Sequence, residues 1–249
     1  MMRIHKMVDQ ILKDYYGVGW PRFYWDFEEH PDNYDAEVVE KWPIFVQVVV
    51  EGIFEDPTID MLAADFGLTL EEVTGDKPTK WTAPKTLNIT YLLTNSQKSP
   101  GGVSWRSGGV DVYVPEEYVQ RGDIEPIKET TYHEVAHYFD NVAGTIEPTS
   151  ASASFFDRWM AHPDEQEAIK AEIYSLMNGG YTDEEVLWIL MEDFEDNINH
   201  NSSNPAKSKI VFQQFLESAI EQIRASGEVL IEDEPTGQLP LFPSEAIVI

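Results

Sequence analysis

The chain of 249 residues is 42% hydrophobic and 12% aromatic, which is enough to bury a sizeable core in one large domain or two closely joined lobes. It carries 17 basic against 45 acidic residues, and the resulting net charge of -28 opposes direct binding to nucleic acid or to anionic membranes. Cysteine is absent, which excludes disulfides and thiolate ligands and leaves His, Asp and Glu to hold any metal.

The chain shows no export signal at its N-terminus and no apolar run of about 18 residues that could cross a membrane. We therefore expect a soluble, cytoplasmic protein.

The first part of the sequence, residues 1–80, predicts a helical subregion. Apolar residues recur at helical spacing over residues 4–16, and an aromatic stretch that contains Pro21 follows. Residues 35–54 and 58–66 also have a helical pattern, as does the short segment 70–73 after a capping box.

Strand-like composition begins after residue 80. Residues 86–93 and 109–114 are rich in β-branched and aromatic side chains, and residues 103–106 lie between glycine-bearing turns. We predict three strands, the last two paired as a hairpin. These strands begin the second region, residues 81–231, and we expect them to form a small mixed or antiparallel sheet.

The helical pattern returns for the remainder of this region. It covers residues 124–141 and then 164–177, where Asn178 and two glycines mark the end. Thr182, with Glu185 in the capping-box position, starts a helix that we expect to continue to Ile198, and a last helix covers residues 207–225. The fold class predicted is α+β, with a helical C-terminal subdomain and a flexible acidic tail at residues 232–249.

The motif with the clearest chemistry lies in the helix at 124–141. His133 and His137 stand four residues apart, so both imidazoles lie on one helical face and can share a metal ion. Zinc suits these ligands, and Glu134 is placed to act as the general base of a metallopeptidase. Because a catalytic zinc site has three protein ligands and one open position, a third ligand is required.

Glu192 is the favoured third ligand. It precedes Asp196 by four residues in a predicted helix, so one helical face would offer a ligand and a partner for the free ring N–H of His133. Four other acidic residues are alternatives for the third ligand: Glu195, Asp193, Glu167 and Asp157.

These motifs make residues 85–200 similar to the gluzincin metallopeptidases, in which a Glu-x-x-x-Asp helix follows the His-Glu-x-x-His helix. Asp140, seven residues after His133, and the run that begins at Glu192 resemble the catalytic domain of anthrax-lethal-factor-like enzymes. The segment before the motif resembles the edge strand and hairpin of thermolysin-type enzymes. The resemblance implies a zincin-like fold, a zinc endopeptidase, and a strand that pairs with extended substrate through Val103, Ser104 and Trp105.

The roles of several neighbouring residues depend on less specific signals. Such an enzyme benefits from a hydrogen-bond donor that stabilises the oxyanion, for which Tyr181 is our choice, with His200 and Tyr138 as alternatives. Asp140 either supports the metal site or caps the end of its own helix.

The tail contains Gln238, Leu239, Leu241 and Phe242, which resemble the motif that docks bacterial proteins on the sliding clamp. The alternative is that these apolar residues fold back on the protein's own surface.

The sequence thus predicts a zinc-dependent metallopeptidase that acts on a peptide or protein substrate. The alternative is a structural or interaction protein, for example a component of a larger particle, that retains a zincin fold.

Overall fold

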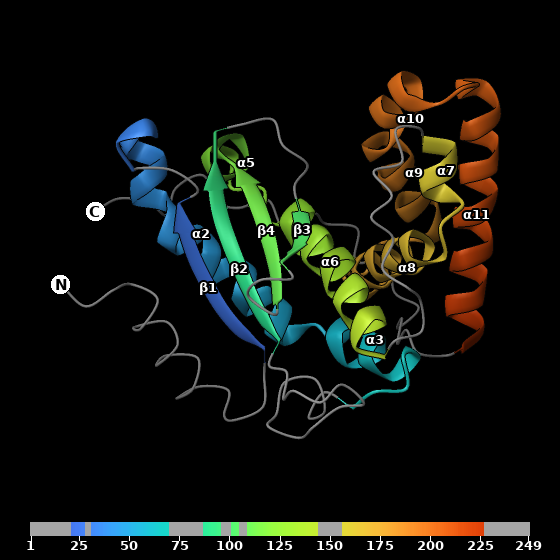
Figure 1. Cartoon of the computed structure of the whole chain (residues 1–249), viewed down its shortest axis with the longest axis horizontal. Coiled ribbons are helices and arrows are strands. Elements are labelled where there is room, and N and C mark those ends of the chain that lie inside the picture. Colours follow the sequence, from blue (N-terminus) through green and yellow to red (C-terminus); the bar gives the residue numbers. More distant parts are fainter. Residues whose placement is uncertain are drawn as a thin grey trace.

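The computed structural model describes residues 21–27, 31–69, 87–95, 101–104, 109–143 and 156–226. Within them the protein is mixed α/β and mostly helical, with one small sheet (Figure 1). The strands are β1 (Arg22–Phe27), β2 (Asn88–Thr94), β3 (Gly101–Ser104) and β4 (Gly109–Pro115). The helices are η1 (Pro31–Asn33), α2 (Ala36–Glu55), α3 (Thr58–Asp65), α5 (Glu116–Arg121), α6 (Glu125–Ala143), α7 (Phe156–Met160), α8 (Pro163–Asn178), α9 (Asp183–Asp193), α10 (Glu195–Asn201) and α11 (Pro205–Ser226).

The described strands form a mixed sheet in the order β1-β2-β4-β3. Strands β1, β2 and β4 are parallel, and β3 pairs antiparallel with β4 at the edge, so the predicted pairing of the last two strands is confirmed. An antiparallel sheet, the other form we had expected, is not what the described strands form. The aromatic segment 22–27 was not predicted to be a strand, yet it pairs with β2. A domain boundary at residue 80 would therefore separate two neighbouring strands.

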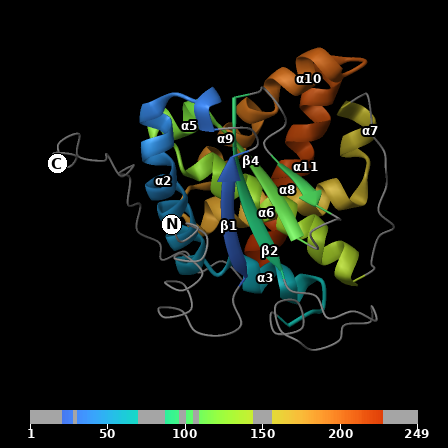
Figure 2. The ribbon, with the colours of Figure 1, turned by 60° about the vertical axis from the view of Figure 1, so that its left-hand side comes forward.

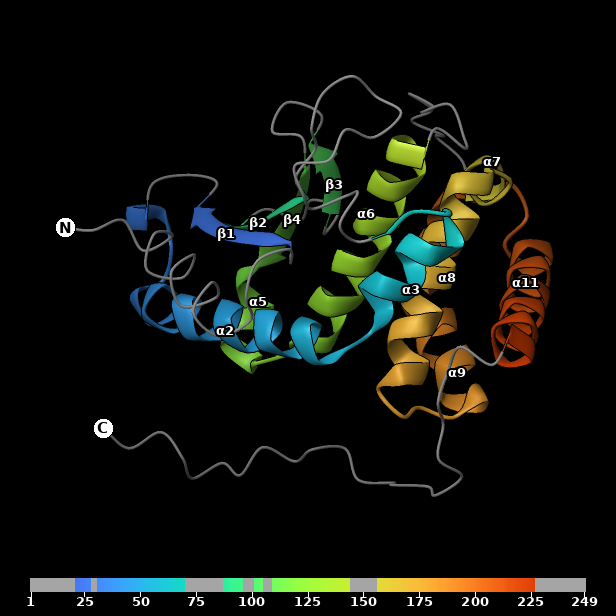
Figure 3. The ribbon, with the colours of Figure 1, turned by 90° about the horizontal axis from the view of Figure 1, so that it is seen from below.

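One face of the sheet is covered by helices α2 and α6 (Figures 2 and 3). The strand register places Phe23 beside Ile89 and Ile89 beside Val110, and all three are essentially fully buried. Because successive side chains in a strand point to opposite faces, Tyr91 and Val112 continue the same apolar face one pleat further on. The alternation of apolar residues along the strands thus decides which face of the sheet packs against α6.

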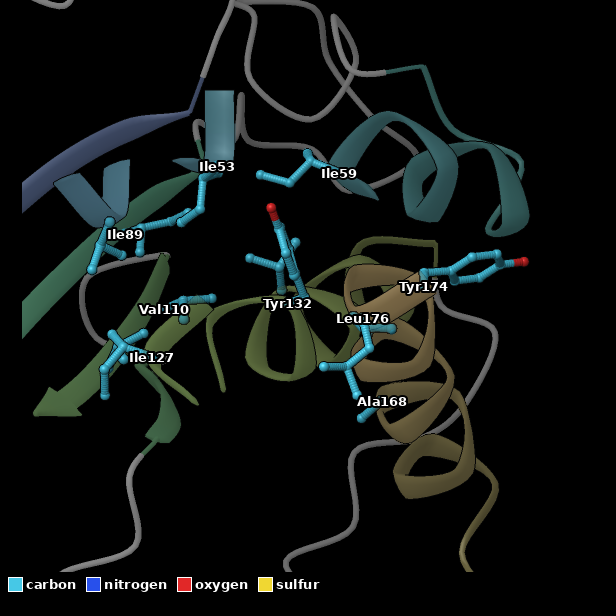
Figure 4. Close-up of a cluster of buried hydrophobic side chains, with 14 of the residues drawn as sticks. Ile53, Ile59, Ile89, Val110, Ile127, Tyr132, Ala168, Tyr174 and Leu176 are labelled. Carbon is cyan, nitrogen blue, oxygen red and sulfur yellow. The ribbon is translucent and has the colours of Figure 1, made fainter. Parts of the chain in front are cut away.

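Helix α6 lies between the sheet and a second layer of helices (Figure 1). It packs along α8, around which α7, α9 and α11 are arranged. Its Tyr132 is buried and extends toward Ile53 and Ile59 (Figure 4), while the hydroxyl groups of Thr131 and Tyr91 lie 3.2 Å apart on the sheet side. A helix enclosed on both sides in this way places its polar residues inside the protein.

Most of the helices predicted from the sequence are confirmed. The segments 35–54, 58–66, 124–141, 164–177 and 207–225 are all helical, and the capping box of Thr182 and Glu185 is present. None of the described helices is long and apolar enough to cross a lipid bilayer. The predictions for residues 4–16, for residues 70–73, and for Gln238, Leu239, Leu241 and Phe242 in the tail lie outside the described residues.

One predicted helix is wrong in its extent. The helix that starts after Thr182 ends at Asp193, and Phe194, with φ -90° and ψ -4°, separates it from α10. Glu192 and Asp196 are consequently on different helices, and the single face that was to carry both does not exist.

Candidate metal centre

Helix α6 brings the two motif histidines together. His133 and His137 are one turn apart, and their Nε2 atoms are separated by 3.2 Å. The two rings meet nearly at right angles, with centroids 4.8 Å apart. Both side chains are largely buried between α6 and α8. The predicted common face is therefore confirmed.

The third member of the group is Glu165, in the first turn of α8. Its Oε2 atom lies 3.5 Å from Nε2 of His133 and 3.5 Å from Nε2 of His137. Among the residues that the structure describes, these three form the group whose ligand atoms all lie within 4.8 Å of one another. The helix that was expected to end at Asn178 thus supplies the carboxylate, although Glu165 was not among the predicted ligands.

The spacing of these three atoms suits a tetrahedral metal ion. Zinc binds imidazole nitrogen and carboxylate oxygen at about 2.0–2.2 Å, so two ligands at tetrahedral positions are about 3.3–3.6 Å apart. The separations of 3.2, 3.5 and 3.5 Å are close to that range. Two imidazoles and one carboxylate also form the donor set of known catalytic zinc sites with an open fourth position.

Glu172 orients the first histidine. Its Oε1 atom lies 2.6 Å from Nδ1 of His133, on the side of the ring that faces away from His137. An ionised carboxylate only accepts hydrogen bonds, so Nδ1 of His133 carries a proton, and Nε2 is the nitrogen that faces the other two ligand atoms and would bind a metal ion once it is deprotonated. Glu172 follows Glu165 by seven residues, and this spacing places both on one face of α8.

The charge balance of the group favours a cation. Burial alone would lower the pKa of His133, but the carboxylates of Glu172 and Glu165 raise this pKa well above its ordinary value. Burial would raise the pKa of Glu165, yet the two imidazoles, each with its Nε2 atom 3.5 Å from Oε2, hold this pKa at about 2. The group thus attracts positive charge, either as a proton on His133 or as a bound metal ion.

Glu134 lies beside the group as a buried carboxyl. The residue is 9% exposed, and this burial raises its pKa. The charges of His133 and His137 lower the pKa and partly offset the effect of burial. The charges of Glu165 and Glu172 also act on it, so it shares the electrostatic environment of the three ligand atoms. A buried carboxyl with a raised pKa is suited to accept a proton and then return it.

Glu192 and Asp196 are not part of this group. Glu192 is exposed on α9 and Asp196 is exposed on α10, whereas Glu165 and Glu172 are the carboxylates that lie beside the histidines. Of the alternatives, Glu195 pairs with Lys209, and Glu167 pairs with Lys170. The side chain of Asp157 lies outside the described part of the chain, and Asp193 does not belong to the group either.

The other predicted site residues have mixed outcomes. Tyr181 is half-buried beside the first turns of α6, where burial and the charges of Glu125 and Glu129 raise its pKa, so its surroundings are not those of the two histidines. Asp140 is buried one turn after His137, and its supporting role stays a prediction. Val103 and Ser104 lie in β3, which packs against α6, while Trp105 lies outside the described residues.

A sequence signal for the missed residues does exist. Glu165 and Glu172 are in phase with Ala168, Ile169 and Ile173, which are fully buried, so two acidic residues stand on the apolar face of their helix. Buried carboxylates require a partner or a metal ion, and this makes acidic residues on a core-facing stripe informative. The Glu-x-x-x-Asp spacing predicted for the ligand helix does not match the seven-residue spacing of Glu165 and Glu172.

Comparison of the chain with protein-family models, with curated proteins and with solved structures gives no match.

Proposed function

We propose that this protein is a zinc-dependent metallopeptidase, in which His133, His137 and Glu165 hold the ion and Glu134 is the general base. The observation that carries the proposal is the convergence of two imidazole nitrogens and one carboxylate oxygen at 3.2–3.5 Å, next to a buried glutamate. As in the gluzincins, the proposed third ligand comes from a helix other than the one that carries the two histidines. Here that helix is α8, and the second acidic residue follows the ligand by seven residues instead of four.

Each residue has a separate role in peptide hydrolysis. His133, His137 and Glu165 would hold the zinc ion, which would supply a bound water with a pKa of about 7 and would polarise a substrate carbonyl. Glu134 takes a proton from the attacking water, and the oxygen forms a bond to the carbonyl carbon. When the C–N bond breaks, Glu134 returns the proton to the leaving amine. Glu172 holds the ring of His133 in one orientation throughout.

The edge strand β3 supports a mode of substrate binding. It is the last strand of the described sheet and packs against α6, which carries the motif. An extended peptide could pair with its open side as an added strand, and Val103 and Ser104 would contribute main-chain groups. This would align a peptide bond along the helix that carries Glu134.

The test is the Glu134→Gln variant, assayed with a mixed peptide library. We expect the variant to retain zinc, because Glu134 is not one of the three proposed ligands. It should lose hydrolysis, because the glutamine amide cannot accept the proton from water. Glu167→Gln, half-buried on the same helix and paired with Lys170, is the matched control and should cleave like the parent. A Glu134→Gln variant as active as the parent would show that the mechanism is wrong. If the parent binds zinc but cleaves no peptide, and forms a defined larger particle, the structural alternative is favoured.

A further inference from the structure

A cavity separate from the metal centre lies between α7, the start of α8 and the first turns of α11. Its volume is about 390 Å³, within the range of small-molecule sites. The cavity is not lined by His133, His137 or Glu165 of the candidate metal centre, nor by Glu172, the partner of His133. The proposed peptidase chemistry therefore makes no use of this space.

The deep wall of the cavity is aromatic and fixed in place. Phe156 and Phe212 meet edge to face with centroids 5.6 Å apart, and both are almost fully buried. Phe194 packs against both rings from behind, with its centroid 5.0 Å from that of Phe212. Because these rings support one another, the apolar surface is formed before any ligand arrives.

Apolar residues continue from the cavity to the surface. Val211 lines its wall and is 52% exposed, and Phe215 lies one turn further along α11. Exposed apolar side chains beside a preformed apolar cavity are typical of a binding site.

The mouth of the cavity carries a positive side chain in a protein of strongly negative net charge. Among the described residues that line the cavity none is acidic, and Lys207 is the charged one. Within the described residues the ammonium group of Lys207 makes no hydrogen bond or ion pair, whereas nearby Lys209 pairs with Glu195. Lys207 also stands in the first turn of α11. This turn has no acidic residue, and the helix dipole adds positive potential there.

We propose that this cavity binds a small apolar carboxylate. The hydrocarbon or aryl body lies against Phe156 and Phe212, and the carboxylate faces Lys207 at the mouth. The charge complementarity sets the polarity of the ligand, because an apolar cation would meet Lys207 and the positive end of α11.

The test is calorimetric titration of the full chain with decanoate and with decanol, which has the same chain length but no charge. Decanoate should bind, and Lys207→Gln should weaken its affinity about tenfold, the loss expected for a charge-assisted hydrogen bond, while decanol affinity stays the same. Val211→Glu, a change at an exposed position, should weaken decanoate binding at least as much. Lys209→Gln is the control and should have no effect.

Two results would overturn the proposal. One is the absence of binding at decanoate concentrations up to about 1 mM, the weak limit for a specific site. The other is decanoate binding that Lys207→Gln leaves unchanged, or that Lys209→Gln weakens equally.

Discussion

The Nδ1 atom of His133 lies 2.6 Å from Oε1 of Glu172, although 39 residues separate them in the chain. The contact fixes which ring nitrogen carries the proton and turns the other nitrogen toward His137 and Glu165. It also joins α6 to α8, so the orientation of a proposed metal ligand depends directly on the packing of two helices.

Removal of this contact should weaken zinc binding without abolishing it. We expect Glu172→Ala to lower zinc affinity about 10–100-fold, the usual effect of the loss of an orienting partner. Glu172→Gln should lower it less, because the amide oxygen can still accept the hydrogen bond. Competition with a chromophoric chelator measures both affinities. Glu167→Gln, on the same helix and paired with Lys170, should bind zinc like the parent. Equal affinities for Glu172→Ala and the parent would contradict this role.

Loss of the proposed third ligand should have a larger effect. Glu165→Gln should lose more zinc affinity than the roughly 100-fold expected for an orienting partner, because a carboxylate ligand is replaced by a weak neutral donor. Glu192→Gln is its control. Because Glu192 is exposed on α9, this variant should bind zinc with the affinity of the parent. The comparison uses the same competition assay. A larger loss in Glu192→Gln than in Glu165→Gln would restore the ligand set inferred from the sequence.

The sequence predicted the features that depend on local spacing. In the metal site, His133 and His137 share a face because a helix has 3.6 residues per turn. Elsewhere in the fold, the capping box at Thr182 depends on four consecutive residues. Glu165 could not be chosen over Glu192 in this way, because the choice depends on which helix packs against α6. The parallel strand β1 was missed for a related reason: its pairing with β2 joins residues more than 60 positions apart, and its aromatic pattern was not alternating enough to be recognised.

The buried carboxyl of Glu129 should make stability depend on pH. Burial and the charges of Glu172 and Asp193 raise its pKa in the folded protein well above the ordinary value. The folded state therefore favours the protonated form, and stability is lost as pH rises from about 4.3, the unfolded value, through the folded pKa. Below that window the group has no effect.

Glu129→Gln, which mimics the neutral form, should be more stable than the parent at pH 8 by about 1 kcal/mol, or about 2–4 °C in Tm, and the gain should shrink toward pH 5. Calorimetric melting at several pH values, at constant zinc concentration, measures it. Glu221→Gln, at an exposed position of α11, should show no such trend. A gain that is the same at pH 5 and pH 8 would exclude titration of Glu129 as its cause.

A polar cluster at the end of α8 should contribute to stability. The amide of Asn178 donates to Oδ1 of Asp56 at 3.2 Å and to Oγ1 of Thr58 at 3.0 Å, and so joins α8 to the start of α3. Asn178→Ala would leave the buried Asp56 short of a donor, and we expect a loss of about 1–3 kcal/mol in urea unfolding. Asn201→Ala, which removes an exposed hydrogen bond to Asn197, should cost less than about 0.5 kcal/mol. Equal losses in the two variants would mean that the cluster has no special role.

Anomalous diffraction at the zinc edge, from crystals of the zinc-loaded protein, would show whether His133, His137 and Glu165 hold the proposed catalytic zinc ion. We expect one peak about 2.0–2.2 Å from both Nε2 atoms and from a carboxylate oxygen of Glu165, with Glu172 still bonded to Nδ1 of His133. A peak coordinated by another carboxylate, or no peak between the two histidines, would rule out this ligand set.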